Sequence, residues 1–393
     1  MNNRNLVGIT AAFSLLFVYA QTLQQYITVV FAGRGDVNDG YIGLILIYVF
    51  FFLGSFVAPV ILIRMGAKRS FLLIMPPYLL TRISFIYGNI ALFFTACVLL
   101  GCAASLLWNA HFVYMGRISE EHLRGRNSGF FWGIFSATTG IGLVASGPLL
   151  TILPQSIVFL IYLFVGALAY VPFWKLDGKR DNTPNREGWK NQLPIFKSPT
   201  AIRMTGCIFT AYLIYGLVIA YVPLEIAEIS GTHMVGILSS PFFVIPALTS
   251  FYFGKMADRL GRFPTMSLGL ALSVIGLGIL YYAHNTFLLF CGIAVSTFGF
   301  SALYPMTTIL PADITPKGML ERMSGTFNAV GSFGILCGII MPFLVSGKAA
   351  YLVGLGMTLA IAALTLSLGR GGLDHVCIKI SDELDKSLQA NRA

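Results

Sequence analysis

The sequence predicts an all-α membrane protein in which twelve spanning helices form two pseudo-symmetric six-helix bundles. Only 11% of the 393 residues are charged and 56% are hydrophobic, whereas about a quarter of the residues in a soluble domain are charged. A helix needs about 20 apolar residues to cross the hydrocarbon core of a membrane. Twelve apolar runs of this kind follow one another, and the longest polar stretch divides them six and six.

The polar stretch at residues 175–203 is expected to be a cytoplasmic central loop. It separates an N-terminal bundle, residues 1–174, from a C-terminal bundle, residues 204–368. The tail at 369–393 has apolar residues at four-residue spacing, which predicts either an amphipathic helix on the cytoplasmic surface or a partner-binding helix. The spans are expected at 6–31, 41–63, 71–87, 90–115, 128–153, 155–174, 204–225, 234–253, 264–283, 287–310, 324–346 and 349–368.

The distribution of basic residues predicts the orientation in the membrane. Of the 26 Lys and Arg residues, all except Arg34, Arg82 and Lys348 fall at the termini or in the loops on the same side as the termini. Because loops rich in Lys and Arg stay in the cytoplasm, we expect both termini to be cytoplasmic and the cell membrane to hold the protein. The net charge of +10 forms no continuous basic stripe, so nucleic acid is not an expected partner.

The loop between the eighth and ninth expected spans carries a recognisable pattern. Residues Gly254–Arg262 read G-K-M-A-D-R-L-G-R. This pattern resembles the cytoplasmic signature loop of the major facilitator superfamily. The resemblance implies that Asp258 is a latch carboxylate at a helix end, with Lys255, Arg259 and Arg262 as its basic partners. It also implies that the chain is a transporter with two six-helix halves.

The two halves repeat each other at an offset near 196, as parallel duplicated halves do. In the first half Ile63 stands where the second half has Asp258, so the first latch lacks its carboxylate. By the same resemblance Arg64, Arg126 and Arg322 are gating residues, and we expect Asp258 to pair with Arg322. The corresponding stretches are 64–66 and 259–261, 105–108 and 301–304, and 126–131 and 322–327.

A second resemblance is narrower. The run Gly125–Phe135, together with Leu107–Ala110 and Tyr41–Leu53, resembles the ion-channel-regulatory, uncoordinated-type branch of the superfamily. Some members of that branch are channel accessory subunits or trafficking chaperones, and others are regarded as transporters. The resemblance therefore implies two different functions.

Polar residues on the first span predict a binding surface. Gln21, Gln24, Gln25 and Thr28 follow helical spacing and share one face. Polar groups that face lipid are costly, so this face is expected to meet a cavity or another helix. Three glutamines exceed what helix packing requires, and we favour a substrate cavity over hydrogen bonds between helices.

By resemblance, the first, fourth, seventh and tenth spans line a central cavity in this superfamily. The aromatic residues among the candidates are equally consistent with packing and with binding. Small residues at Gly129, Gly133, Gly334 and Gly338 predict close helix contacts at the seam between the halves. The candidate substrate-binding residues on the other three spans are Ser105, Trp108, Asn109, Tyr212, Tyr215, Ser301 and Tyr304.

Few ionisable residues lie within the expected spans. Arg82 is the only Lys or Arg well inside a span, where it either extends its side chain to the outer surface or serves an anion or gating site. No Asp or Glu lies mid-membrane. This favours facilitated diffusion, or ion coupling through Glu225 or His111. The alternative for Glu225 is a surface carboxylate, and the alternative for His111 is an imidazole that packs between helices.

The sequence contains no P-loop, G-x-S-x-G or H-E-x-x-H motif, and its six cysteines have no metal-ligand spacing. We therefore expect no enzyme activity, no cofactor and no metal. The predicted function is secondary transport of a small, neutral or weakly polar organic solute by alternating access. The alternative is a non-transporting membrane subunit that regulates or traffics an ion channel or another membrane protein. The expected partners are the solute, the lipid bilayer and, in the alternative, that membrane protein.

Overall fold

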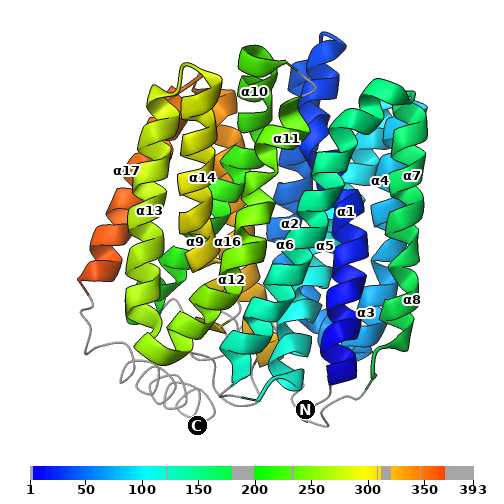
Figure 1. Cartoon of the computed structure of the whole chain (residues 1–393). Helices are drawn as coiled ribbons and strands as arrows, with labels where there is room; N and C mark the ends of the chain where they lie inside the picture. The colour runs from blue at the N-terminus through cyan, green and yellow to red at the C-terminus, as the bar shows by residue number, and fades with distance from the viewer. Residues whose placement is uncertain are drawn as a thin grey trace.

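The computed structural model describes residues 3–120, 123–178, 199–231, 234–307, 309–310, 320–345 and 347–367. These residues are helical or lie in short turns and connections (Figure 1). Twelve helices among them are long and apolar enough to cross a membrane. The predicted all-α, twelve-span fold class is confirmed. The predicted tail and most of the predicted central loop lie outside the described residues.

Each span is helical over almost its whole length. Their bounds are α1 (Asn3–Gly33), α2 (Val37–Met65), α3 (Ala67–Leu73), α4 (Met75–Tyr87), α5 (Ile90–Ile118), α6 (Arg124–Ile152), α7 (Gln155–Leu168), α8 (Tyr170–Lys175), α9 (Pro199–Ala220), α10 (Val222–Ser230), α11 (Val235–Ser239), α12 (Pro241–Leu260), α13 (Arg262–Tyr282), α14 (Thr286–Leu303), α16 (Leu320–Leu344) and α17 (Ala349–Leu366).

Four spans consist of two helices each: α3 with α4, α7 with α8, α9 with α10, and α11 with α12. Proline lies at the first or second position of α4, α10 and α12. A proline lacks the backbone N–H that continues the hydrogen-bond ladder, so a helix breaks before it. Helix α14 ends at Leu303, within the predicted tenth span, and Pro305 follows two residues later; residues 306–307 and 309–310 are helical again.

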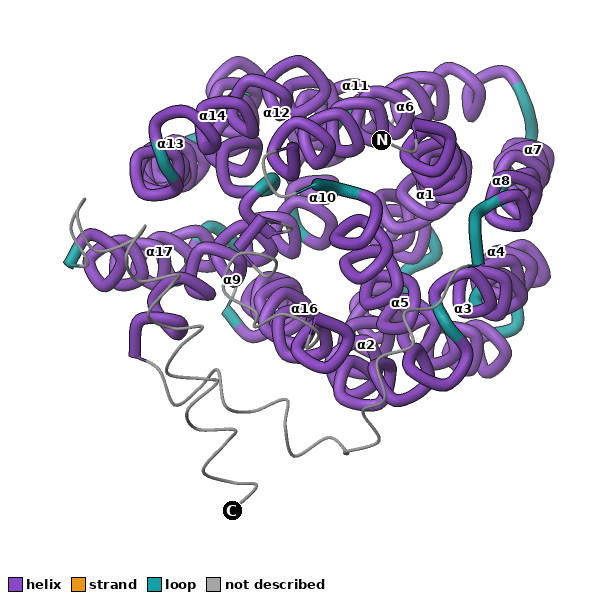
Figure 2. The backbone as a smooth tube through the Cα atoms, turned by 90° about the horizontal axis from the view of Figure 1, so that it is seen from below, coloured by secondary structure: helices purple, strands orange, loops and turns teal. Residues whose placement is uncertain are grey.

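The spans form two groups that meet along a central seam (Figures 1 and 2). Helices α1 to α8 pack together on one side, and α9 to α17 pack together on the other. Across the seam, α6 packs along α12 and α2 packs along α16, while α1 also contacts α9 and α10. We call the end at which α1 begins and α12 ends the terminal face, which is the lower end in Figure 1.

Glycines allow α6 and α12 to approach closely across the seam. A Cβ atom on Gly129 would lie 3.0 Å from the Cα of Phe251, and one on Gly254 would lie 2.7 Å from the carbonyl oxygen of Gly125. The expected close contact at the fifth span is therefore present. The glycines of the eleventh span do not line the seam. A Cβ on Gly334 would lie 2.5 Å from the carbonyl oxygen of Phe209, because this face of α16 packs on α9 in its own half.

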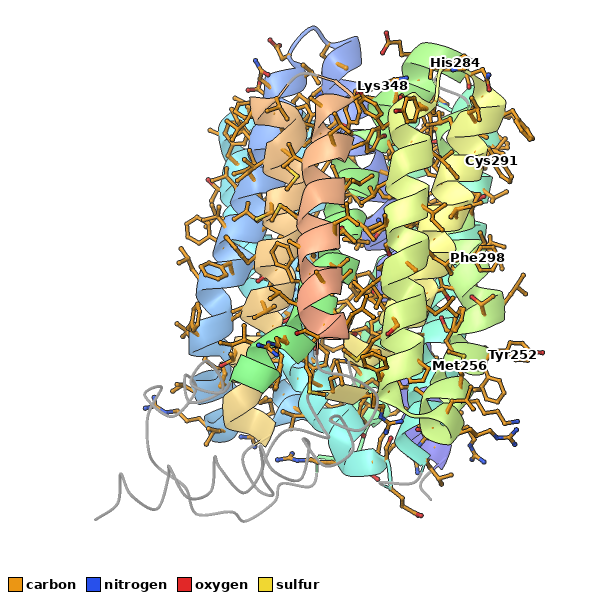
Figure 3. The ribbon with its side chains drawn as sticks, turned by 90° about the vertical axis from the view of Figure 1, so that its left-hand side faces the viewer. Tyr252, Met256, His284, Cys291, Phe298 and Lys348 are labelled. Carbon is orange, nitrogen blue, oxygen red and sulfur yellow. The ribbon has the colours of Figure 1, made fainter. Side chains whose placement is uncertain are left out.

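Apolar side chains cover the outside of the bundle. Tyr252, Phe298 and Cys291 project outward from the helices (Figure 3), and Tyr252 and Phe298 are exposed. Such a surface is stable when lipid covers it. Many polar side chains of the spans are instead buried in the interior or at the seam.

Candidate functional site

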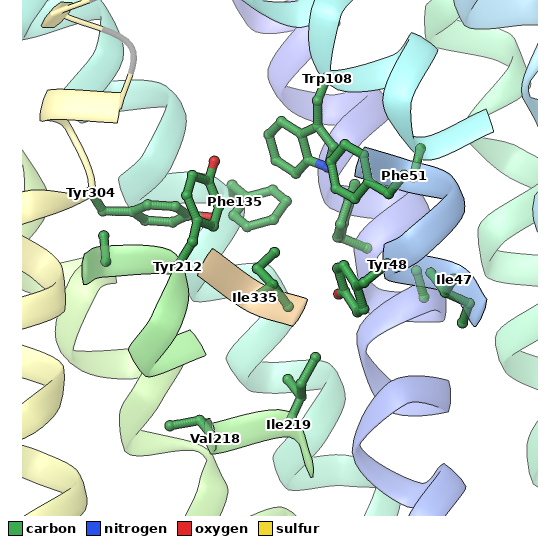
Figure 4. Packing of buried hydrophobic residues seen from close by; sticks show 14 of the residues in the cluster. Ile47, Tyr48, Phe51, Trp108, Phe135, Tyr212, Val218, Ile219, Tyr304 and Ile335 are labelled. Carbon is green, nitrogen blue, oxygen red and sulfur yellow. The ribbon is translucent and has the colours of Figure 1, made fainter. Parts of the chain in front are cut away.

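A small cavity lies at the seam, midway along the spans. Helices α1, α2, α4, α5, α6, α9, α12, α14 and α16 contribute to its wall. The aromatic residues from the N-terminal half are Phe17, Tyr48, Phe51, Tyr78, Trp108 and Phe135. Those from the C-terminal half are Tyr212, Tyr215, Phe243, Phe300 and Tyr304. Figure 4 shows rings from both halves around this space.

The cavity wall is neutral. No Asp, Glu, Lys, Arg or His is among the described residues that line it. The ring centroid of Tyr304 lies 3.9 Å from that of Trp132 and 4.2 Å from that of Phe300. Tyr304 and Phe300 line the cavity, whereas Trp132 packs on Tyr304 without lining it and joins the two halves there. Ring faces such as those of Tyr304 and Phe300 favour flat apolar or aromatic groups.

Two glutamines of α1 provide the amide groups of the wall. The hydroxyl of Tyr215, on α9, donates to Oε1 of Gln21 at 2.6 Å and lies 3.1 Å from Oε1 of Gln24. The hydroxyl of Tyr48, on α2, lies 3.4 Å from the same Gln24 oxygen. The predicted polar face of the first span therefore meets the cavity, and its hydrogen bonds join the two halves.

The same face continues away from the terminal face without lining the cavity. Gln25 and Thr28 are fully buried. Both side-chain polar atoms of Gln25, and the hydroxyl of Thr28, have no hydrogen-bond partner among the described residues. These two predicted binding residues are thus separated from the cavity in the present conformation.

A polar network closes the seam between the cavity and the terminal face. Nδ2 of Asn109 donates to the Ser105 carbonyl at 2.8 Å, and the hydroxyl of Ser324 donates to Oδ1 of Asn109 at 2.8 Å. Nδ2 of Asn328 donates to the Ser55 hydroxyl and to the Ser105 carbonyl, both at 3.2 Å. Ser105 and Asn109 therefore join α5 to α16, and Asn328 also joins α16 to α2. The structure places them in this seam network and not on the cavity wall.

Of the two predicted binding residues of the tenth span, Tyr304 and Ser301, one lines the cavity and the other does not. Tyr304 lines the cavity. Ser301 is fully buried and its hydroxyl contacts the hydroxyl of Thr249 on α12, within the same half. Ser301 therefore joins α14 to α12 and does not face the cavity.

Asp258, the predicted latch residue, lies at the end of α12 on the terminal face. Its Oδ1 forms an ion pair with Nη1 of Arg262 at 2.9 Å, and the same nitrogen donates to the Ala257 carbonyl at 2.7 Å. A Cβ on Gly125 would overlap the Asp258 carboxylate, so the carboxylate lies against the first turn of α6. The first turn of a helix has unpaired N–H groups and a partial positive charge, which stabilise an anion.

The other predicted gating residues lie on the same face. Arg64 is in the last turn of α2, Arg126 is in the first turn of α6, and Arg259 is in the last turn of α12. The side chain of Arg322 lies outside the described residues, so its pairing with Asp258 stays a prediction. The contact of α12 with α6 makes the α6 end the neighbour of Asp258 in the structure.

Arg82 does not extend to the surface, and this expectation was wrong. Its side chain is fully buried because α4 directs it toward α1 and α7. Nη2 donates to the Tyr19 carbonyl at 2.7 Å and to the Thr22 hydroxyl at 3.1 Å. The guanidinium lies 4.8 Å from the ring centroid of Tyr19 and 5.0 Å from that of Phe159, which gives cation–π stabilisation.

The expectation that Glu225 is a surface carboxylate was also wrong. Glu225 is only 3% exposed, and its Oε2 accepts a hydrogen bond from the Tyr351 hydroxyl at 2.7 Å. Its Oε1 lies 3.9 Å from Nζ of Lys348, which also donates to the Ala283 carbonyl. This ion pair joins a buried carboxylate to a partly exposed lysine. It lies near the face opposite the terminal face and does not line the cavity.

His111 packs among rings of the N-terminal half. Its ring centroid lies 4.3 Å from that of Phe131, 4.9 Å from that of Phe13 and 5.4 Å from that of Trp108. Neither ring nitrogen has a hydrogen-bond partner among the described residues. This environment fits the helix-packing alternative.

Sequence reasoning missed cavity residues on spans outside the four that it considered. Tyr48 and Phe51 come from α2, Tyr78 from α4, Phe135 from α6 and Phe243 from α12. The pair Tyr48 and Phe51 has helical i, i+3 spacing, which was a signal for a shared face. Its interpretation required knowing which face of α2 turns toward α1.

The comparisons with known proteins agree with this architecture. Residues 204–371 match the family model of the Major Facilitator Superfamily, and residues 32–165 match that of the ion channel regulatory protein UNC-93. A bacterial homologue of the iron transporter ferroportin, in an outward-facing state, has a similar fold with a TM-score of 0.71. The two are 14% identical, and the match covers 93% of this chain and 98% of the homologue.

Curated relatives match over parts of their length. UNC93-like protein MFSD11 of Xenopus laevis is 26% identical over 251 residues, which are 58% of this chain and 56% of that protein. Multidrug resistance protein 2 of Bacillus subtilis is 29% identical over 38% of this chain and 36% of its own length. Quinolone resistance protein NorA of Staphylococcus aureus is 26% identical over 33% of this chain and 34% of its own length. The chain thus spans about half, or less, of the length of these relatives.

Twelve spans in two groups, with a cavity at the seam between them, define a multi-pass membrane protein with a transporter fold. The C-terminal part of the chain is similar to the Major Facilitator Superfamily, and its N-terminal part is similar to the ion channel regulatory protein UNC-93.

Proposed function

We propose that this chain is a secondary transporter that moves a small, neutral or weakly polar organic solute by alternating access. The main support for this proposal is the aromatic cavity at the seam. The described residues that line it provide amides and hydroxyls but no charged side chain. A charged solute would lose its hydration there without gaining a partner of opposite charge. The names of two relatives, a multidrug resistance protein and a quinolone resistance protein, support an organic solute.

Closure at the terminal face fits one state of such a cycle. The seam is held there by the hydrogen bonds of Asn109 with Ser324 and of Asn328 with Ser55, and by Asp258 against α6. Opening toward this face requires these contacts to separate and α12 to leave α6. By the charge distribution of the sequence, the terminal face is the cytoplasmic face.

The position of the ionisable groups favours facilitated diffusion. No carboxylate is among the described residues of the cavity wall, so the solute does not meet a proton-carrying group directly. Glu225 remains the candidate for ion coupling, because it is buried beside Lys348 at the opposite end of the seam helices. Transport that depends on a proton or sodium gradient, and is lost in Glu225→Gln, would show this coupling.

Solute binding is the first test. The thermal unfolding of the purified full-length protein is measured in detergent against a panel of neutral aromatic and aliphatic solutes. A ligand at 100 times its dissociation constant stabilises the folded state by about 2.7 kcal/mol. Gln24→Met should abolish this stabilisation, whereas Gln25→Met, the same change next to it but off the cavity wall, should keep it. Equal stabilisation in both variants would place the binding site elsewhere.

A specific observation favours a second candidate. The match of residues 32–165 to the UNC-93 model supports a regulatory or trafficking subunit of an ion channel or other membrane protein. In that case no solute would stabilise the protein, Gln24→Met would leave its function unchanged, and a membrane protein partner would co-purify with the chain from its native membrane.

A further inference from the structure

We infer that Arg82 sets the charge preference of the cavity, so that an organic anion binds more tightly than an organic cation of the same shape. The inference rests on the proposed transport function and adds a specificity-determining residue to it. Arg82 is not among the residues that line the cavity. Its effect comes from a positive charge held directly behind the wall, and not from contact with the solute.

Two helices place Arg82 behind the wall. Its Nη2 donates to the Tyr19 carbonyl at 2.7 Å. The carbonyl carbon of Tyr19 is bonded to the nitrogen of Ala20, which lines the cavity. Standard peptide bond lengths therefore place Nη2 within about 5 Å of the Ala20 nitrogen. On α4, Tyr78 lies about one helical turn before Arg82 and also lines the cavity.

The charge of Arg82 has no carboxylate partner among the described residues. Nε and Nη1 have no hydrogen-bond partner there, and Nη2 contacts only neutral groups, the Tyr19 carbonyl and the Thr22 hydroxyl. The ring centroids of Tyr19, Phe159 and Tyr162 lie 4.8, 5.0 and 5.6 Å from the guanidinium carbon. Ring faces stabilise a cation but have no net charge. Because arginine stays protonated in proteins, a full positive charge remains.

The cavity therefore lies in the field of an unpaired positive charge. The only other Asp, Glu, Lys or Arg among the buried described residues is Glu225, which lies in the other half of the chain, 3.9 Å from Nζ of Lys348. With one wall residue and a van der Waals contact between them, a charged group of the solute lies about 12 Å from the guanidinium. At an effective dielectric constant of about 20, this interaction changes the affinity by about tenfold.

The sign of the interaction separates anions from cations. Both ions lose hydration in a cavity whose described wall has no charged side chain, which favours uncharged solutes over both. The field of Arg82 then lowers the affinity for a monovalent cation by about tenfold and raises that for an anion by about tenfold. The anion should therefore bind about 100-fold more tightly than the cation.

Three probes with one ring system and head groups of similar size test the inference. Naphthalenesulfonamide is uncharged, naphthalenesulfonate is an anion, and naphthyltrimethylammonium is a cation. Their saturable binding to the purified full-length protein is measured by equilibrium dialysis in a non-ionic detergent. The sulfonamide should bind most tightly, and the sulfonate should bind about 100-fold more tightly than the ammonium compound.

Salt distinguishes the effect of Arg82 from that of the protein surface. The net charge of +10 also favours anions, but salt screens exposed charges, and the Debye length is about 3 Å at 1 M. Arg82 is fully buried, so its field in the cavity is screened much less. The ratio of sulfonate affinity to ammonium affinity should therefore persist in about 1 M salt.

Arg82→Met removes the charge and keeps a long side chain. Because the charge is unpaired, its removal leaves no buried partner without a counter-ion, and the variant should fold. The ratio of sulfonate affinity to ammonium affinity should fall by about 100-fold. Thr22→Val is the matched control, because it removes one hydrogen bond of Arg82 but keeps the charge in place, and Thr22 is not among the lining residues. The ratio should not change in this control.

The outcomes separate the inference from the function on which it rests. If the sulfonate and the ammonium compound bind equally to the unsubstituted protein in about 1 M salt, Arg82 does not set the charge preference. The same conclusion follows if Arg82→Met leaves the ratio unchanged, or if Thr22→Val lowers it equally. Binding of the sulfonamide that depends on Gln24 would still support transport. If no probe binds saturably, and no other solute stabilises the protein in a manner that depends on Gln24, the inference and the proposed transport function are both wrong.

Discussion

The close contact between α6 and α12 makes Gly254→Ala a sharp test of movement at the seam. The new Cβ would lie 2.7 Å from the carbonyl oxygen of Gly125, a backbone atom that cannot move aside by rotating a side chain. Overpacking of this kind costs about 1–3 kcal/mol. Alanine also favours a helix over glycine by about 0.5–1 kcal/mol, but this gain is the same in all conformations that keep α12 helical.

Only the clash therefore changes the equilibrium between closed and open terminal faces. A penalty of about 1–3 kcal/mol on the closed state shifts the population toward the open state by about 5- to 150-fold. Gly133→Ala is the matched control, because it lies on the same seam and its Cβ would approach no atom more closely than the Ala247 carbonyl at 3.4 Å. It adds the same helix propensity without the clash.

The assay is the distance between spin labels at Phe130 on α6 and Tyr252 on α12, both exposed on the outside of the bundle. Labels are attached in a background without the native cysteines, and pulsed electron paramagnetic resonance gives the distance distribution. Gly254→Ala should increase the population with the longer distance, whereas Gly133→Ala should match the unsubstituted protein. A folded Gly254→Ala variant with an unchanged distribution would refute the interpretation of this seam as a moving contact.

Three further experiments have expected outcomes. Arg82→Lys keeps the charge but loses the planar donor group that binds the Tyr19 carbonyl, so the free energy of unfolding should fall by about 1–3 kcal/mol; unchanged thermal unfolding would contradict this. Gln25→Met removes a buried amide that has no hydrogen-bond partner among the described residues, so the free energy of unfolding should rise by about 1–3 kcal/mol. A fall in the free energy of unfolding would show that the amide is hydrogen-bonded. A double-mutant cycle of Asn109→Ala and Ser324→Ala should give a coupling energy of about 0.5–1.5 kcal/mol, and additive effects would exclude their hydrogen bond.

The fold could be predicted because span formation depends on local composition. Each apolar run is long enough to cross the membrane whatever its neighbours are, and hydrocarbon forces it to form a helix. Helix ends were less predictable where proline intervenes, as at Pro305 after α14. The amide face of Gln21 and Gln24 was also predictable, because polar residues with helical spacing on an apolar helix share one face, and that face must avoid lipid.

The remaining site depends on how each helix is rotated against its neighbours, which a single sequence does not specify. Asn109 and Trp108 are adjacent in sequence, yet Trp108 faces the cavity and Asn109 faces Ser324 across the seam. Ser301 was expected in the cavity because, by resemblance, the tenth span lines it, but Ser301 faces Thr249. Arg82 lies close enough to a helix end to reach the surface, but α4 turns it toward α1.

Solute counterflow tests the central claim most directly. The full-length protein is reconstituted into lipid vesicles loaded with an excess of an unlabelled solute that stabilises it, and a trace of the labelled solute is added outside. A carrier that alternates around one cavity should concentrate the label transiently inside, and Gln24→Met should abolish this while Gln25→Met retains it. Label that only equilibrates, at the same rate in vesicles with and without the protein, would contradict alternating access and favour the regulatory function.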